Sequence, residues 1–236
     1  MSKKEIQRAR IRQYFIDATR EVIREEGIGN VTIRKVADLA GYNSATIYNY
    51  FEDVSHLIFF AAMTYLREYV KDLAEHVKHV ENALDEYLLI WERFCVHSFS
   101  QPEIYHAIFG SNLGELPDDI VKSYYDMSPD DLDDLPPELL PMLLEANLNK
   151  RSEIALQRCI QAGYVNPADS QKVTNLIVLI YTGMLSLFYN KRRNYTVETA
   201  TTLVVEYIRI IIVTSKVMFN DLGEPTDGHD QQPANV

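Results

Sequence analysis

Apolar residues recur at helical spacing along nearly the whole chain, and this periodicity decides the fold class. Between Arg8 and Glu26 the apolar positions follow one another at steps of four, three and four residues, which places them on one face of a helix. The alternating pattern with hairpin turns that is typical of β-strands occurs nowhere in the sequence. The sequence therefore predicts an all-α protein.

Capping residues and apolar spacing predict where the other helices lie. Thr32 and Asn43 are good N-caps for two short helices, of which the second runs to about Tyr50. A longer helix is expected to begin near Ser55. Further helices are expected at about 82–99, 102–112, 138–163, 170–190 and 196–219. The acidic, proline-containing segment 115–138 is expected to form a loop or a pair of short turns.

Composition narrows the function classes. Two cysteines cannot form a disulfide framework, and no four-ligand zinc pattern exists. The first residues lack the apolar stretch of a signal peptide, and the longest apolar run, from Leu176 to Tyr189, is shorter than the roughly 18 residues that a membrane span needs. These features predict a reduced, soluble protein of the cytoplasm with no membrane segment.

The formal net charge of −11 is the sum of two unlike parts. Residues 1–50 carry nine basic and six acidic side chains, a balance of +3, so the rest of the chain carries −14. The total alone argues against a nucleic-acid partner. A basic segment at one end of an acidic chain is instead a sign of nucleic-acid contact at that end.

The two short helices are joined by the turn Gly41-Tyr42-Asn43, which matches the geometry of a helix-turn-helix. In that motif the second helix enters the major groove of DNA. Ile47 and Phe51 can pack inward, which leaves small and hydroxyl-bearing residues on the outside, where hydroxyls can donate to phosphate oxygens. The same turn and caps also suit an ordinary three-helix packing, so spacing alone leaves both interpretations open.

The stretch from Thr32 to Phe51, followed by Leu57, resembles the DNA-binding signature of the TetR family of bacterial repressors. The residues at the family's spacing are Ala37, Ala40-Gly41, Thr46-Ile47-Tyr48, Tyr50-Phe51 and Leu57. The resemblance covers about residues 9–69, and the remainder is similar to the family only in helical layout and length.

Two positions depart from the family pattern. Asn43 stands where Ser or Thr is usual, a change that still caps a helix. Val54 stands where the family usually has a phosphate-contacting Lys, so Lys35 or Arg34 would have to compensate.

The resemblance implies a TetR-type helix-turn-helix DNA-binding domain at 9–69, with the motif itself at about 32–51. A helical ligand-binding and dimerisation domain would follow at 70–219, and 220–236 would be a disordered tail. The implied function is a repressor that a small-molecule effector releases from a near-palindromic operator in double-stranded DNA. The alternative is a helical small-molecule-binding or adaptor protein that no longer binds DNA specifically.

The resemblance also implies a homodimer, and the last two helices support it independently. The helices at about 170–190 and 196–219 are apolar nearly all round, so they must be buried against their own domain on one side and against something else on another. A four-helix interface between two subunits is the simplest answer. A large monomeric core is the competing interpretation.

By position, Thr32, Arg34, Tyr48 and Tyr50 resemble phosphate contacts, while small and polar residues of the second short helix are the candidate base readers. The predicted DNA-binding residues are Thr32, Arg34, Lys35, Asn43, Ser44, Ala45, Thr46, Tyr48, Asn49 and Tyr50. The N-terminal Lys3, Lys4, Arg8 and Arg10 either add nonspecific affinity or form a solvated helix start.

The middle helices are expected to hold the effector pocket, since aromatic residues with one polar group suit an amphipathic cavity. The candidate ligand-binding residues are Tyr65, Trp91, Phe94, Cys95, Phe99, Tyr105, Phe109, Tyr124, Tyr125, Met142, Asn147, Met184 and Phe188. For each of them plain core packing is the competing interpretation. The acidic surroundings favour a cationic, hydrophobic effector, or the exposed acidic loops only solvate the surface.

Neither an enzyme nor a metal or cofactor site is expected. Asp72, His76 and His79 could share one helix face, but no further ligand is evident and a solvated face is preferred. Cys95 and His97 are two residues apart and cannot face each other on a helix. A glycine-rich phosphate loop, a nucleophile elbow and a catalytic carboxylate pair are all absent from the sequence.

Overall fold

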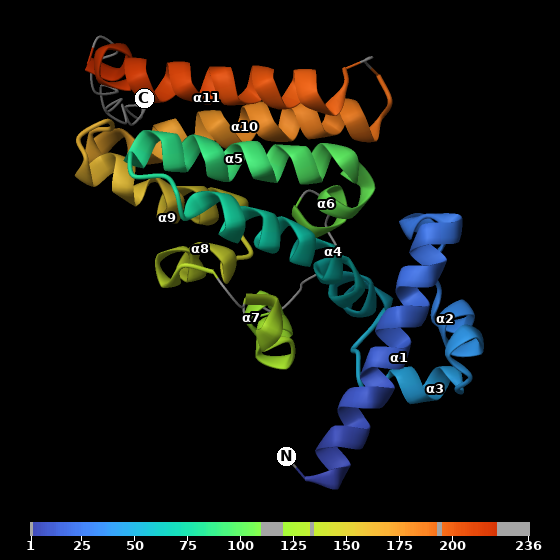
Figure 1. The fold of residues 1–236 in the computed structure, drawn as a ribbon. Coiled ribbons are helices and arrows are strands. Elements are labelled where there is room, and N and C mark those ends of the chain that lie inside the picture. The colour runs from blue at the N-terminus through green and yellow to red at the C-terminus, as the bar shows by residue number, and fades with distance from the viewer. Residues whose placement is uncertain (1, 110–119, 133–134, 193–194, 221–236) are drawn as a thin grey trace, which may run out of the picture.

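The structure, a computed structural model of the chain, describes residues 2–109, 120–132, 135–192 and 195–220. Within these ranges all regular structure is helical and no strand occurs, which confirms the predicted all-α class. The tail 221–236, predicted to be disordered, lies outside the described residues. Figure 1 shows the N-terminal helices, here called the head, beside a larger group of helices, here called the body.

The head comprises α1 (Lys3–Glu26), α2 (Ile33–Ala40) and α3 (Ser44–Ile47). The body comprises α4 (Val54–Val77), α5 (Ala83–Ser100), α6 (Pro102–Phe109), α7 (Ile120–Met127), α8 (Leu140–Leu143), α9 (Leu148–Gln161), α10 (Ser170–Tyr189) and α11 (Val197–Asn220). Short 3₁₀ turns lie at Ile28–Asn30, Pro129–Leu132, Pro137–Leu139 and Pro167–Asp169.

Local capping defines the ends of the two short head helices, as predicted. The Thr32 Oγ1 accepts a hydrogen bond from the Lys35 N–H at 3.3 Å and starts α2. The Asn43 Oδ1 accepts from the Ala45 N–H at 2.9 Å and starts α3. Gly41 ends α2 in the left-handed conformation with φ +75°, which a residue with a Cβ adopts only with strain. α3 is shorter than expected, because residues 48–50 form a turn.

An apolar core holds the head helices against each other and against the start of α4. Phe15, Val36, Ala37 and Ile47 are fully buried there. The Phe15 ring meets the Tyr42 ring at 5.2 Å between centroids. Burial of aromatic and aliphatic side chains is the main stabilising term in a domain of this size.

α4 joins the head to the body. It packs against α1 at one end and against α5 and α6 further along (Figure 1). Asp53 caps it, since the Asp53 Oδ1 accepts from the His56 N–H at 2.8 Å. The helix passes through the predicted domain boundary at 69/70 without a break, and that boundary remains a prediction.

Two segments differ from the predicted helix bounds. The single helix expected at 138–163 is divided into α8 and α9, because Asn147 starts a new helix by accepting from the Lys150 N–H at 3.1 Å. The acidic segment 115–138 contains the helix α7, where a loop or turns were expected. Ile120, Val121, Tyr124 and Tyr125 of α7 are buried, so its apolar face is part of the core.

α5, α10 and α11 pack against one another in the part of the body shown uppermost in Figure 1. Residues Pro167–Tyr189, which contain α10, are long and apolar enough to cross a membrane by length and composition alone. The core helix of a soluble protein passes the same test. α10 also packs against α6 and α9, as a core helix does.

Candidate nucleic-acid interface and ligand cavity

The outer side of α3 and the turn that follows it present the predicted base-reading residues. Ala45, Tyr48 and Asn49 are exposed, Tyr48 by 58%, while Ser44 and Thr46 are partly exposed. Ile47 is fully buried and fixes the orientation of the helix on the head. Small side chains at the centre of the outer face allow α3 to approach another surface closely.

Arg8 connects the start of α1 to this surface. One Arg8 Nη donates to the Asn49 carbonyl oxygen at 3.2 Å, and the guanidinium carbon lies 5.7 Å from the centre of the Tyr50 ring. Tyr50 itself is partly buried, with its ring 5.8 Å from Phe15. An open groove between α1 and the end of α3 is lined by Lys4, Gln7, Arg8, Ile11, Asn49 and Tyr50. Of the N-terminal basic residues, Lys4 and Arg8 therefore belong to the same surface as α3.

The two candidates for the missing phosphate-contacting Lys differ in their surroundings. The Lys35 Nζ is 2.6 Å from a carboxylate oxygen of Glu26 and donates to the Asn30 carbonyl at 3.2 Å. Arg34 has its Nε 3.9 Å from an Asp38 oxygen and its side chain is 89% exposed. Val54 is partly buried at the start of α4, packed against the core. Arg34 is thus the freer of the two cations.

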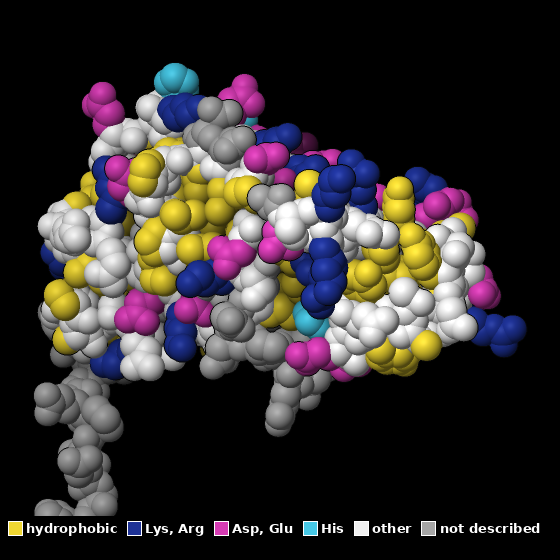
Figure 2. Space-filling view, turned by 90° about the horizontal axis from the view of Figure 1, so that it is seen from below, with side chains coloured by type: hydrophobic (Ala, Val, Ile, Leu, Met, Phe, Trp, Pro, Cys, Tyr) yellow, Lys and Arg dark blue, Asp and Glu magenta, His cyan; other side chains and the backbone are white. Residues whose placement is uncertain are grey.

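Basic side chains are spread across the underside of the molecule. Figure 2 shows Lys and Arg side chains at separate points in the half of the view that contains the head, with Asp and Glu side chains between them. On this side the head offers separate cationic points and no continuous basic surface among its described residues.

His56 sits where the head meets α4. Its Nδ1 accepts a hydrogen bond from the Glu52 N–H at 3.1 Å, and its ring lies 5.0 Å from Phe60 and 5.8 Å from Phe51. Burial lowers the pKa of His56 against the opposing effect of the Glu52 and Asp53 carboxylates. The neutral imidazole is therefore the form that this junction favours.

This preference predicts a pH dependence of stability. A His whose pKa is lowered in the folded state stabilises that state fully above its ordinary pKa of 6.5. This stabilisation is lost as the pH falls towards and through the lower pKa of the folded protein. We expect urea unfolding between about pH 7.5 and pH 5 to show a smaller loss of stability for His56→Gln than for the unchanged protein. An equal loss in the two proteins would contradict this role.

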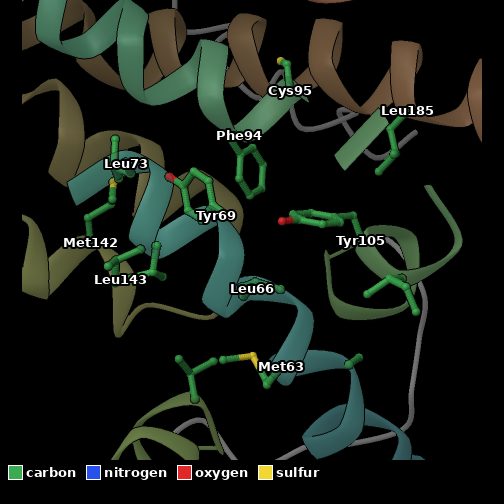
Figure 3. Packing of buried hydrophobic residues seen from close by; sticks show 14 of the residues in the cluster. Met63, Leu66, Tyr69, Leu73, Phe94, Cys95, Tyr105, Met142, Leu143 and Leu185 are labelled. Carbon is green, nitrogen blue, oxygen red and sulfur yellow. The ribbon is translucent and has the colours of Figure 1, made fainter. Parts of the chain in front are cut away.

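The body contains a small cavity between α4, α5, α8 and α9. The residues that line it are Tyr69, Ile90, Trp91, Phe94, Met142, Leu148, Arg151, Ser152 and Ala155. Its free volume of about 20 Å³ holds about one water molecule, so a larger ligand requires the side chains to move apart. Figure 3 shows Tyr69, Phe94 and Met142 in this part of the core.

Three of the candidate ligand residues, Trp91, Phe94 and Met142, line this cavity. Most of the others are buried in the core without lining it, namely Cys95, Phe99, Tyr105, Tyr124, Tyr125 and Met184. The remaining four lie elsewhere. The Phe188 ring stacks on the Phe99 ring at 5.0 Å between centroids, and the Phe109 ring lies 5.4 Å from the Phe94 ring. The Tyr65 ring lies 5.6 Å from the Arg20 guanidinium carbon, and Asn147 caps α9.

Arg151 and Tyr69 line the cavity but are absent from the predicted ligand set. Arg151 is only 4% exposed, and its guanidinium carbon lies 5.6 Å from the centres of the Phe94 and Phe109 rings and 5.8 Å from that of Tyr69. A signal for Arg151 exists in the sequence, since it follows Leu148 by three residues and precedes Ala155 by four. That spacing places a charge on the apolar face of its helix.

Asp72 takes part in contacts between helices. Its carboxylate lies 2.9 Å from the His97 Nε2 on α5 and 3.0 Å from the His76 Nδ1 on α4. In the described part of the chain no group of three or more His, Cys, Asp or Glu side chains is arranged to hold a metal ion.

α10 and α11 expose large apolar side chains along adjacent helices. The exposed residues are Leu179, Tyr189, Tyr207, Ile210, Val213 and Val217. Leu179 and Val217 are 69% and 67% exposed. Beside them Gly183 leaves open space where a Cβ would be, so another surface can approach α10 closely.

Comparison with known proteins places the head in a family. Residues 15–58 match the family model described as bacterial regulatory proteins, tetR family. The matched segment contains most of α1, all of α2 and α3 and the start of α4. No curated protein matches the chain.

Solved structures share the fold over most of the chain. A putative TetR-family transcriptional regulator from Syntrophomonas wolfei is 17% identical, with a TM-score of 0.57 over 86% of this chain and 95% of that one. RolR in complex with resorcinol is 14% identical, with a TM-score of 0.58 over 93% and 97% of the two chains. FadR from Bacillus subtilis in complex with stearoyl-CoA is 16% identical, with a TM-score of 0.53 over 86% and 97%.

Proposed function

Since the chain belongs to the tetR family of bacterial regulatory proteins and is a DNA-binding transcriptional regulator, we propose that it is a dimeric repressor which a small-molecule effector releases from its operator. The observation that carries the proposal is the exposed polar outer side of α3, oriented by the buried Ile47 and bordered by Arg8. We further propose that the protein acts in the cytoplasm and crosses no membrane.

Each predicted DNA-binding residue has a proposed role. Ser44, Ala45, Thr46 and Asn49 would meet base edges in the major groove. Tyr48, with its exposed hydroxyl, would donate to a phosphate oxygen, together with Thr32 and Arg34. The cap residue Asn43 and the partly buried Tyr50 would mainly hold the geometry, and Lys35 would contact DNA only by exchanging Glu26 for phosphate.

The direct test is a footprint on the DNA on either side of the protein's own gene. We expect protection of two half-sites related by an approximate two-fold axis, one helical turn or a multiple of it apart. Absence of specific protection at every salt concentration would contradict the proposal.

A matched pair of variants tests the phosphate role of Tyr48. Tyr48→Phe removes only the hydroxyl, so affinity is expected to fall roughly tenfold on operator and unrelated duplexes alike. Tyr164→Phe, the same change in the body, where the hydroxyl accepts from the Asn82 side chain at 3.0 Å, is expected to leave DNA affinity unchanged. Fluorescence anisotropy measures both, and a changed sequence preference in Tyr48→Phe would contradict the assignment.

The proposed dimer uses α10 and α11. Their exposed apolar side chains lie on neighbouring helices, and an uncovered surface of this kind marks a site of association in soluble proteins. Pairing two copies would bury these side chains in a four-helix interface and present two heads to one operator.

The proposed effector site is the body cavity. RolR and FadR were solved with a small ligand, resorcinol and stearoyl-CoA respectively, and they share this fold. In this chain α4 carries Tyr69 at the cavity wall and Leu57 in the core near its start. A ligand that pushes the cavity walls apart would therefore act on the helix that holds the head. Release follows if the effector binds the DNA-incompetent arrangement more tightly.

A further inference from the structure

We propose that the effector is an organic carboxylate with an apolar body, and that Arg151 binds the carboxylate group. This inference rests on the proposed function in one respect, since it takes the cavity to be the effector site. The evidence for it is the geometry of the cavity and the hydrogen-bond partners of the polar groups that line it.

Among the residues that the structure describes, Arg151 is a buried cation that forms no ion pair. The buried charged residues of the described chain are Glu86, Asp131, Arg151 and Asp169. The three carboxylates each have a cationic partner in Arg158, Arg67 and Lys172 respectively. Among the described residues no ion pair includes Arg151, and one of its Nη atoms is buried without a hydrogen-bond partner.

Aromatic rings alone do not satisfy this guanidinium. The rings of Tyr69, Phe94 and Phe109 surround it at cation–π distance. A ring face presents negative charge density to the cation but offers no lone pair to the unpartnered Nη group. A buried cation normally has a carboxylate or several oxygen acceptors. The site is therefore complete only when an acceptor enters.

The other polar groups of the cavity are also donors. The Tyr69 hydroxyl is fully buried beside the Arg151 guanidinium, which opposes the effect of burial on its pKa, and it makes no hydrogen bond of standard geometry with the described residues. Burial raises the pKa of Tyr69, so this hydroxyl keeps its proton and can donate. The Ser152 hydroxyl is already bonded to the Tyr87 hydroxyl at 2.9 Å. The described lining contains no carboxylate, so the free polar groups favour an acceptor-only group.

The rest of the wall is apolar. These apolar side chains favour a hydrocarbon or aromatic body beside the carboxylate, and they belong to Ile90, Trp91, Phe94, Met142 and Leu148. Met142 is the most adaptable of them, because its unbranched side chain changes rotamer easily, and it lies in the short helix α8. Opening on that side would enlarge a space that now holds about one water molecule.

The chain carries its own reporter for the test. Trp91 is its only tryptophan and lines the cavity, so its fluorescence can be titrated without DNA. The probes are benzoate and octanoate, each against its neutral amide, benzamide and octanamide. We expect a saturable change with at least one carboxylate and affinity about tenfold or more weaker for its amide. Equal binding of acid and amide, or no saturable change with either acid, would overturn the proposal.

Variants of Arg151 assign the preference to the guanidinium. In Arg151→Met the preference for the acid over the amide is expected to disappear, while the melting temperature stays equal or rises, because an unpaired buried charge is removed. Lys150→Met, which removes a neighbouring exposed charge from the same helix, should leave the preference unchanged. Retained preference in Arg151→Met, or a melting temperature lowered by many degrees, would overturn the proposal.

A second substitution covers the possibility that Arg151→Met does not fold. Arg151→Lys keeps the charge but removes the planar fork that matches a carboxylate. We expect it to weaken the acid about tenfold and to leave amide binding unchanged. Unchanged acid binding would overturn the proposal. If the protein binds carboxylates through Arg151 but binds no operator, only the repressor function is refuted. If it binds an operator but does not prefer the acid to the amide, only this inference is refuted.

Discussion

Replacing Ile210 by Asp is expected to turn the proposed dimer into monomers and to lower operator affinity by about 100-fold or more. Ile210 is half exposed in the middle of the apolar face of α10 and α11. In the dimer a carboxylate at this position would lose its hydration without gaining a cationic partner. Burying an unpaired ion costs on the order of several kcal/mol. Because each subunit holds one reading head, a monomer also loses the gain from binding two half-sites at once.

Two measurements separate this effect from a loss of folding. Light scattering gives the mass in solution, and circular dichroism gives the helix content, which should be unchanged because Ile210 is exposed within one subunit. Met127→Asp introduces the same carboxylate in place of an exposed apolar residue of α7 and should leave the dimer intact. If Ile210→Asp remains a dimer, the interface lies elsewhere.

Replacing Ala45 by Glu is expected to abolish DNA binding while leaving the fold unchanged. Ala45 is exposed on the outer side of α3, so the head has room for the larger side chain. In a complex with DNA the same position would bring a carboxylate into the major groove, close to the phosphates. Desolvation and repulsion together would lower affinity about 100-fold or more for every sequence.

The matched control is Ala168→Glu. It adds the same side chain and the same charge at an exposed position of the body, in the turn before α10. Anisotropy titrations should show unchanged DNA affinity for Ala168→Glu and an affinity about 100-fold or more weaker for Ala45→Glu. Full binding by Ala45→Glu would mean that α3 does not face DNA.

The head was predictable because its structure depends on local signals. Thr32 and Asn43 cap the helices that follow them, and Gly41 takes the left-handed conformation that the turn needs. The body follows weaker signals. Asn147 can be recognised as the N-cap of α9 only when the preceding helix is known to end before it. The four-residue spacing of Ile120 and Tyr124 in α7 lies inside an acidic segment whose composition is typical of a loop.

The cavity was only partly predictable, because its walls come from distant parts of the chain. Trp91, Phe94 and Met142 were expected there as members of a long aromatic and polar set, but composition could not separate wall from core. Arg151 was missed because an Arg between Lys150 and Ser152 looks like part of a solvated helix. The spacing of Arg151 to Leu148 and Ala155 places it on the apolar face of α9, but its burial depends on how α4 and α5 pack in this part of the body.

Sequence-specific binding of DNA by this protein can be tested by a single titration. The duplex recovered by footprinting and a scrambled duplex of equal length are titrated with the protein by anisotropy at several salt concentrations. We expect an affinity ratio of about 10³ or more in favour of the recovered duplex, and affinities that fall as salt rises. Equal affinity for both duplexes, or binding that does not respond to salt, would contradict it and would favour a helical ligand-binding or adaptor protein.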